Sequence, residues 1–156
     1  MAEFRSFEAE VFIPAPPSTV FAFHQSPFNI PKISGSFPHL EVQRAEPVAV
    51  EGGTFDLLID FGLFSLQWQG RWIEVRQDTL LADTADRSPF EYFRHEHYFM
   101  DVDGGTQMID RLQFSLGRSL LDRGMEMAAV TALLPAAFRE RQRRTLQWFK
   151  QNTPTR

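Results

Sequence analysis

The chain has 156 residues, a formal net charge of −4 and no cysteine. Its length fits a single domain over residues 1–156, the acidic balance argues against a nucleic-acid partner, and the lack of thiols excludes disulfide and thiolate chemistry. No apolar run approaches the ~20 residues of a membrane span and the first residues lack the apolar stretch of a signal peptide, so we expect a cytoplasmic protein.

The first part of the chain predicts one strand and two short helices. Apolar and polar residues alternate over residues 4–13, which is the pattern of a half-buried strand. Three prolines end this strand, because proline cannot donate a hydrogen bond to a sheet. Ser18 is placed to cap a short helix that reaches His24, and residues 28–33 suit a second one. Neither His24 nor His39 has a visible partner, so both are predicted to lie on the surface.

The middle of the chain predicts an antiparallel meander of six strands, because turn signals separate short segments of alternating polarity. Trp68 and Trp72 share one face of the third segment and are predicted to point inward. The 16 phenylalanines and 3 tryptophans of the chain fill a core or line an apolar cavity, and composition does not decide between these roles. The expected strands are residues 40–46, 54–61, 64–76, 79–86, 90–100 and 106–116.

The last segment predicts a long helix from about Leu120 to Gln151, because apolar residues recur at steps of three and four. Pro135 interrupts this pattern. Proline inside a helix removes one hydrogen bond and costs about 3 kcal/mol, so we expect a kink near Ala132. A kinked helix lying across a curved sheet leaves a gap at the bend, which is one way to form a cavity.

Arg141 falls on the apolar stripe of this helix, where an unpaired guanidinium group is costly. Two arrangements remain open. We favour a side chain that extends past the edge of the stripe into solvent. The alternative is an ion pair with a carboxylate such as Asp83 or Asp110.

The most informative segment is the hairpin predicted around Asp103 and Gly104. Asp-Gly between two alternating segments is the strongest short-range hairpin signal, because a type I′ turn needs positive φ at both central residues. Counting outward from this turn gives the register. The expected inner pairs are Phe99–Met108, His97–Asp110, His95–Leu112 and Phe93–Phe114, and the expected outer pairs are Glu96–Arg111 and Arg94–Gln113. An inner face that mixes apolar rings, two histidines and a carboxylate indicates a pocket.

The order of these elements, β-α-α-β6-α, resembles the helix-grip fold of the START or Bet v 1-like (SRPBCC) superfamily. The segment from Ile13 to Pro16 and the helix ending at His24 are similar to its strand-to-helix junction. Later motifs resemble its bacterial polyketide cyclase/dehydrase-like branch. They are Ser88-Pro89-Phe90 after Asp83, the series Phe93, His95, His97 and Phe99, Gly105-Thr106 with Asp110, and Phe138 with Arg141.

This resemblance implies an α+β fold in which a curved antiparallel sheet wraps around the long C-terminal helix. It also implies a cavity between sheet and helix that holds a lipid-like, polyketide-like or other small hydrophobic ligand. The residues expected to contact this ligand are Phe21, Trp68, Trp72, Phe93, His95, His97, Phe99, Met108, Asp110, Leu134 and Phe138.

The two histidines and Asp110 allow several interpretations. His95 and His97 lie at i and i+2 of one strand, so both rings point the same way. Asp110 could simply accept a hydrogen bond from His97, the group could anchor the polar head of a ligand, or the aspartate could orient a histidine that moves protons. His-x-His with a carboxylate is also the ligand set of several non-haem iron sites, but the sequence shows no second-shell partner, and we expect no metal and no cofactor.

Three functional hypotheses follow. The leading one is the binding, transport or sequestration of a small hydrophobic molecule. The second is a cyclase or dehydratase in which His97 is the acid/base, Asp110 orients it and His95 polarises a carbonyl group. The third is an interaction module whose interior is filled by its own side chains, in particular by Trp68, Trp72 and Phe93.

Overall fold

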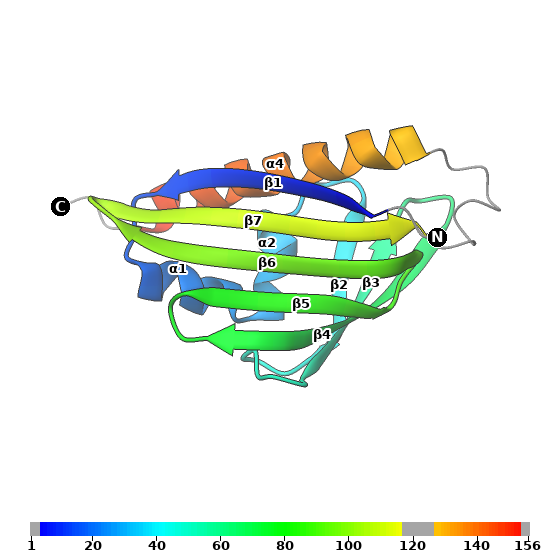
Figure 1. The fold of residues 1–156 in the computed structure, drawn as a ribbon, viewed down its shortest axis with the longest axis horizontal. Helices are drawn as coiled ribbons and strands as arrows, with labels where there is room; N and C mark the ends of the chain where they lie inside the picture. Colours follow the sequence, from blue (N-terminus) through cyan, green and yellow to red (C-terminus); the bar gives the residue numbers. More distant parts are fainter. Residues whose placement is uncertain (1–3, 117–126, 154–156) are drawn as a thin grey trace.

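The computed structural model describes residues 4–116 and 127–153, with side chains from 132 onward in the second range. Every predicted strand is present with bounds within two residues of those expected, and both helical regions are present too. The elements are β1 (Arg5–Ile13), α1 (Pro17–His24), the short 3-10 helix η1 (Pro27–Asn29), α2 (Ile30–Ile33), β2 (His39–Ala45), β3 (Thr54–Asp60), β4 (Ser65–Arg76), β5 (Leu80–Arg87), β6 (Phe90–Val102), β7 (Gly105–Leu116) and α4 (Met127–Asn152) (Figure 1).

The strands form one antiparallel sheet in the order β1-β7-β6-β5-β4-β3-β2. The hairpin register is the predicted one, with Phe99 opposite Met108 and His97 opposite Asp110. The turn type was predicted wrongly. Gly104 has a φ of 81°, but Asp103 does not share the positive φ that a type I′ turn requires at its first central residue.

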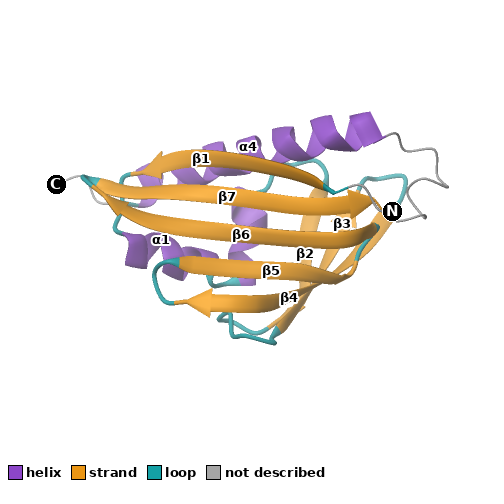
Figure 2. Ribbon diagram, viewed as in Figure 1, coloured by secondary structure: helices purple, strands orange, loops and turns teal. Residues whose placement is uncertain are grey.

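The sheet is strongly curved, and the helices lie on one side of it (Figure 2). The register of β4 with β5 shifts at two places: Asp86 is an extra residue of β5 opposite Gln69 and Gly70, and Ile73 is an extra residue of β4 between Trp72 and Glu74. Such bulges bend a strand and increase its twist. Beyond them, β2 and β3 turn out of the plane of the long strands, toward the side on which α1 and α2 lie (Figure 1).

A close contact between β3 and β4 depends on glycine. Gly70 lies opposite Phe55, and a Cβ atom built on Gly70 would come within 2.1 Å of the Phe55 ring. The ring therefore occupies the space in which a side chain at position 70 would lie, which only glycine allows. In this position Phe55 also meets Trp72, with 5.1 Å between ring centroids.

Helix α4 packs mainly against β1, an edge strand of the sheet (Figure 2). Pro135 lies inside the helix, which continues on both sides of it. The expected kink near Ala132 stays a prediction, and the expected helical residues 120–126 lie outside the described part.

At the other helical region, the N-cap of α1 is Pro16, without a side-chain cap, so the predicted capping role of Ser18 was wrong. Proline is favoured at the first position of a helix, and Pro17 starts this one.

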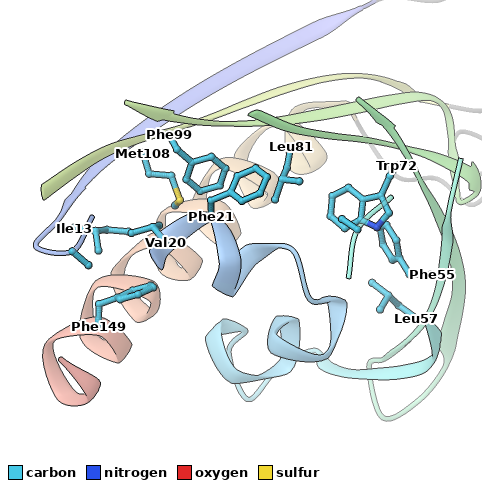
Figure 3. Close-up of a cluster of buried hydrophobic side chains, with 12 residues drawn as sticks. Ile13, Val20, Phe21, Phe55, Leu57, Trp72, Leu81, Phe99, Met108 and Phe149 are labelled. Atoms are coloured by element: carbon cyan, nitrogen blue, oxygen red, sulfur yellow. The ribbon is translucent and has the colours of Figure 1, made fainter. Parts of the chain in front are cut away.

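Two apolar clusters lie between the sheet and the helices. The larger one joins β1, α1, β3, β4, β5, β6, β7 and the end of α4 (Figure 3). In it Phe21 meets Phe99 edge to face, with 5.5 Å between centroids. The smaller cluster contains Phe93 and Phe114 of the hairpin, with Phe138 of α4 packed against it.

Candidate functional site

Four polar side chains on neighbouring strands meet on the inner face of the sheet. His95 and His97 come from β6, Asp110 from β7 and Asp83 from β5. The register places His97 opposite Asp110 and His95 opposite Asp83. All four are buried, with exposed fractions between 1% and 6%. The predicted histidine–aspartate group therefore exists, and it includes a second carboxylate.

Asp110 is shared by both histidines. Its Oδ1 atom lies 3.0 Å from His95 Nε2, which donates a hydrogen bond to it, and 2.6 Å from His97 Nδ1. The second contact is short, but its angle does not meet the geometry of a hydrogen bond, and His97 Nδ1 has no hydrogen-bond partner among the described residues. On the other side of His95, Nδ1 lies 3.6 Å from Oδ2 of Asp83.

Gln142 of α4 holds Asp110 from the helix side. Its Nε2 atom donates to Asp110 Oδ2 at 2.6 Å and to the backbone carbonyl of Ala9 at 3.0 Å. Ala9 belongs to the edge strand β1, so this one amide group ties the helix to both the sheet edge and the cluster. Because the carboxylate is held from two sides, its orientation toward the two imidazole rings is fixed.

The two histidines have opposite protonation tendencies. Burial alone would lower the pKa of His95, but Asp110 and Asp83 outweigh it and the pKa is raised. Burial and the positive charge of His95 lower the pKa of His97 well below its usual value. Burial opposes the charge of Asp110, but its two histidine neighbours hold its pKa well below the ordinary range. These shifts favour the protonated form of His95, the neutral form of His97 and the ionised form of Asp110.

His24 is buried beside this cluster, so its predicted surface position was wrong. Its Nδ1–H donates to the carbonyl of Val20 at 2.8 Å, which leaves Nε2 as an acceptor. That atom is buried and has no partner among the described residues. The ring lies 5.4 Å from the His97 ring, and burial lowers its pKa to about 4. By contrast, His39 is exposed as predicted.

Arg141 forms no ion pair with Asp83 or Asp110, so that predicted alternative was wrong, and the favoured extension past the edge of the stripe stays a prediction. Its side chain is half-buried, and burial lowers its pKa against the opposing charges of Asp110 and Asp83. Within the described part of the chain, its guanidinium group makes no ion pair or hydrogen bond, so neither carboxylate pairs with it directly. The helix carries it close enough for their charges to act on it, but not to ion-pair distance.

The apolar residues predicted to contact a ligand all lie on the inner side, in or against the two apolar clusters. Phe21, Trp72, Phe99 and Met108 belong to the larger one, and Trp68, Phe93, Leu134 and Phe138 belong to or pack against the smaller one. The polar cluster lies between them. His97 is near Phe99, with 6.3 Å between ring centroids, and Phe138 meets His95 edge to face at 4.8 Å.

Sequence reasoning missed three members of the site. Asp83 was named in the motifs of the resemblance and as a possible partner of Arg141 but not as part of the histidine group, His24 was placed on the surface, and Gln142 was not considered. Signals existed for two of them, since Asp83 belongs to the motifs of the resemblance and Gln142 follows Arg141 on a helix expected to face the sheet. The residues that could hold a metal ion are Asp83, His95 and His97, whose ligand atoms lie within 4.8 Å of one another.

Two shallow grooves lie away from the cluster. One, of about 320 Å³, is lined by Ser6, Phe7, Glu8, Arg111 and Gln113. The other, of about 380 Å³, adjoins it and includes Phe4 and Tyr92. No residue of the histidine–aspartate cluster lines either groove.

The seven-stranded curved sheet, the short helices after β1 and the long C-terminal helix define an α+β protein with the Bet v 1-like helix-grip fold. Solved structures with this fold are similar over nearly the whole chain. Ara h 8.0201 is 14% identical, with a TM-score of 0.70 over 96% of this chain and 100% of its own. The aromatase/cyclase ZhuI from Streptomyces sp. R1128 is 15% identical, with a TM-score of 0.71 over 98% of each chain.

A third similar structure is the di-domain aromatase/cyclase StfQ from the steffimycin biosynthetic pathway. It is 11% identical, with a TM-score of 0.75 over 95% of this chain, which spans 51% of that larger protein. At these identities the likeness establishes the fold alone. Neither a protein-family model nor a curated protein matches the sequence. Among the described helices, none has the length and hydropathy to cross a membrane.

Proposed function

We propose that this protein binds a small, mainly apolar molecule between the sheet and α4, with the polar end of that molecule near His24 and Arg141. The observation that carries this proposal is the unpartnered Nε2 atom of His24. Buried polar atoms in proteins almost always have a hydrogen-bond partner, and one that lacks it requires an explanation. A hydroxyl or N–H group of a ligand would supply the missing donor.

The surrounding residues support the same idea. Ligand pockets combine apolar and aromatic walls with a few polar groups that set orientation. Here the two apolar clusters would form the walls, and the histidine–aspartate cluster would provide polar groups between them. Arg141 contributes a guanidinium group without a direct partner in the described chain, which could donate to an oxygen of the ligand. The similar folds of Ara h 8.0201 and the aromatase/cyclases agree with an interior site, without identifying its ligand.

Thermal unfolding and calorimetry with palmitic acid, menadione and emodin test the proposal across three ligand classes. A ligand present at 100 times its Kd raises the free energy of unfolding by about 2.7 kcal/mol. We expect a ligand of at least one class to stabilise the protein by this amount at 100 times its Kd. Arg141→Met should weaken the binding of that ligand. Lys150→Met, which removes an exposed cation from the same helix, serves as the matched control.

If no class stabilises the wild-type protein, the ligand-binding proposal fails. An interaction module with a filled interior would then be the better description. Native mass spectrometry of protein purified from its own host provides an independent measurement, because a retained small molecule adds directly to the mass.

A specific observation also favours a second function, that of a cyclase or dehydratase. His95 and His97 are adjacent, yet their pKa values shift in opposite directions. Titratable neighbours whose pKa values are pushed apart are typical of acid and base pairs in enzymes. Neutral His97 would accept a proton from a carbon next to a carbonyl group, and His95 in its protonated form would donate a hydrogen bond to the carbonyl oxygen.

Turnover of a synthetic poly-β-ketone tests this second function. His97→Ala should abolish product formation while ligand binding persists, because the residue acts on the proton and not on the apolar walls. His39→Ala, which removes an exposed histidine, should leave turnover unchanged. Unaltered turnover in His97→Ala would exclude His97 as the base.

A further inference from the structure

We propose that Asp83, His95 and His97 form a binding site for a divalent transition-metal ion. All three side chains are buried, and the atoms that they would offer to an ion lie within 4.8 Å of one another. Two imidazole rings and one carboxylate form a ligand set that leaves a coordination position open, as in catalytic zinc sites and mononuclear non-haem iron sites. This site is independent of the proposed binding of an apolar molecule.

The separation of Asp83 and His95 suits a bridging ion better than a direct hydrogen bond. Oδ2 of Asp83 and Nδ1 of His95 are 3.6 Å apart, beyond the usual length of an N–H···O bond. A tetrahedral ion with bonds of about 2.0–2.1 Å keeps its ligand atoms about 3.3–3.4 Å apart. A movement of a few tenths of an ångström would thus place both atoms at bonding distance.

Asp110 and Gln142 provide the outer shell that such a site needs. A histidine bound to metal almost always donates its other N–H group to a carboxylate or carbonyl, which fixes the ring and its tautomer. His95 has this arrangement, because Nε2 donates to Asp110 and Nδ1 faces Asp83. Gln142 in turn holds Asp110 through its second oxygen. The sequence offered no second-shell partner for the histidines, and the fold supplies one.

The charges around the site are compatible with a divalent metal ion that carries one anionic ligand. Asp83 and Asp110 bring two negative charges, and Arg141 brings one positive charge from α4. A divalent ion with one anionic ligand in its open position, such as hydroxide or a carboxylate, makes the whole group neutral. Buried charge is tolerated in proteins when it is balanced in this way. Bound metal would also withdraw His95 and His97 from proton transfer, so the loaded site and the cyclase chemistry exclude each other.

Titration of tag-free, chelator-treated protein with Co²⁺ tests the site directly, because Co²⁺ bound in a four-coordinate protein site absorbs visible light. We expect an absorption band that saturates at one equivalent and disappears when Zn²⁺ is added. Calorimetry with Zn²⁺ alone should give the same stoichiometry. No visible band and no heat of Zn²⁺ binding in the wild-type protein would overturn the proposal.

Variants identify which residues hold the ion. Asp83→Asn and His97→Gln are close in shape to the native residues and should each weaken Co²⁺ binding at least 100-fold. Asp110→Asn should weaken it by 10- to 100-fold, the usual effect of losing an outer-shell partner. His39→Gln removes an exposed histidine and should have no effect. Equal affinity in the wild type and in Asp83→Asn, with both folded by circular dichroism, would also overturn the proposal.

Discussion

The burial of His24 has a direct consequence for stability at acid pH. Its pKa is lowered to about 4 in the folded protein by burial, whereas an unfolded chain keeps the ordinary value near 6.5. Below pH 6.5 the unfolded chain therefore takes up a proton that the folded protein rejects until about pH 4. Stability from neutral His24 is complete above pH 6.5 and is lost as the pH falls through this window.

We expect this single residue to account for about 3 kcal/mol of lost stability between pH 6.5 and 4, which corresponds to its shift in pKa. His24→Asn keeps a donor toward the Val20 carbonyl and cannot titrate. Urea unfolding at a series of pH values should give a shallower pH dependence for this variant than for the wild type. His39→Asn is the control, and parallel curves for His24→Asn and wild type would contradict the prediction.

Gln142 is predicted to be the most sensitive polar residue of α4. Gln142→Ala removes the donor from a buried carboxylate oxygen and from the Ala9 carbonyl, both of which then lack that partner. Leaving buried groups unsatisfied costs about 1–3 kcal/mol. Urea unfolding should show this loss, whereas Gln147→Ala, at an exposed position of the same helix, should stay within about 0.5 kcal/mol of the wild type. Equal effects of the two changes would contradict the role of Gln142.

At the scale of elements, the pair of β3 and β4 depends on the contact between Gly70 and Phe55. Gly70→Ala places a methyl group where the ring lies, and overpacking of this kind costs about 1–3 kcal/mol. In a Phe55→Ala background the same change should cost little, because the ring is gone. Gly35→Ala, whose new Cβ would meet only ordinary contacts, is the control.

The free energies of unfolding of the four members of this double-mutant cycle measure the coupling. A cost of Gly70→Ala that is the same with and without the Phe55 ring would show that the contact does not determine packing here.

The sequence predicts the register of one hairpin in the site but not that of the next. The β6–β7 register was predictable because a two-residue Asp-Gly loop fixes which residues pair and because alternation separates the two faces. The β5–β6 connection has no such signal. A turn centred on Ser88 and Pro89 would place Asp83 opposite Arg94, on the outer face, whereas the observed register pairs it with His95. That shift of one residue brings the second carboxylate into the site.

The burial of His24 could not be predicted from the sequence. Its helix is short, and α1 has little amphipathic character by which an inward face could be recognised. The position of His24 depends instead on how α1 docks on β6 and α4, where Phe99 and Phe149 form the surrounding surface. Such a tertiary contact leaves no local pattern in the sequence. The same holds for Arg141, whose depth depends on where α4 crosses the sheet.

At the scale of the whole molecule, the order of strands predicts a gradient of local stability. β6 and β7 pair over their full length and have β5 and β1 as their outer neighbours, while the edge strand β2 pairs only with β3 and has only exposed or half-buried residues. Amide hydrogen exchange is slowest where backbone hydrogen bonds are buried among packed elements. Exchange followed by mass spectrometry should therefore be slowest in β6 and β7 and fastest in β2. Equal protection of β2 and β6 would contradict this gradient.

The polar cluster and part of the apolar interior lie on different strands of the curved sheet. Asp83, His95, His97 and Asp110 come from the three adjacent strands β5, β6 and β7, whereas Phe55, Leu57 and Trp72 come from β3 and β4. Substitutions at the bent end can alter the size of the apolar interior while the polar groups keep their spacing. If the proposed ligand binding holds, related chains could change the size of the molecule that they accept by single substitutions at the bent end, while the histidine–aspartate cluster stays the same.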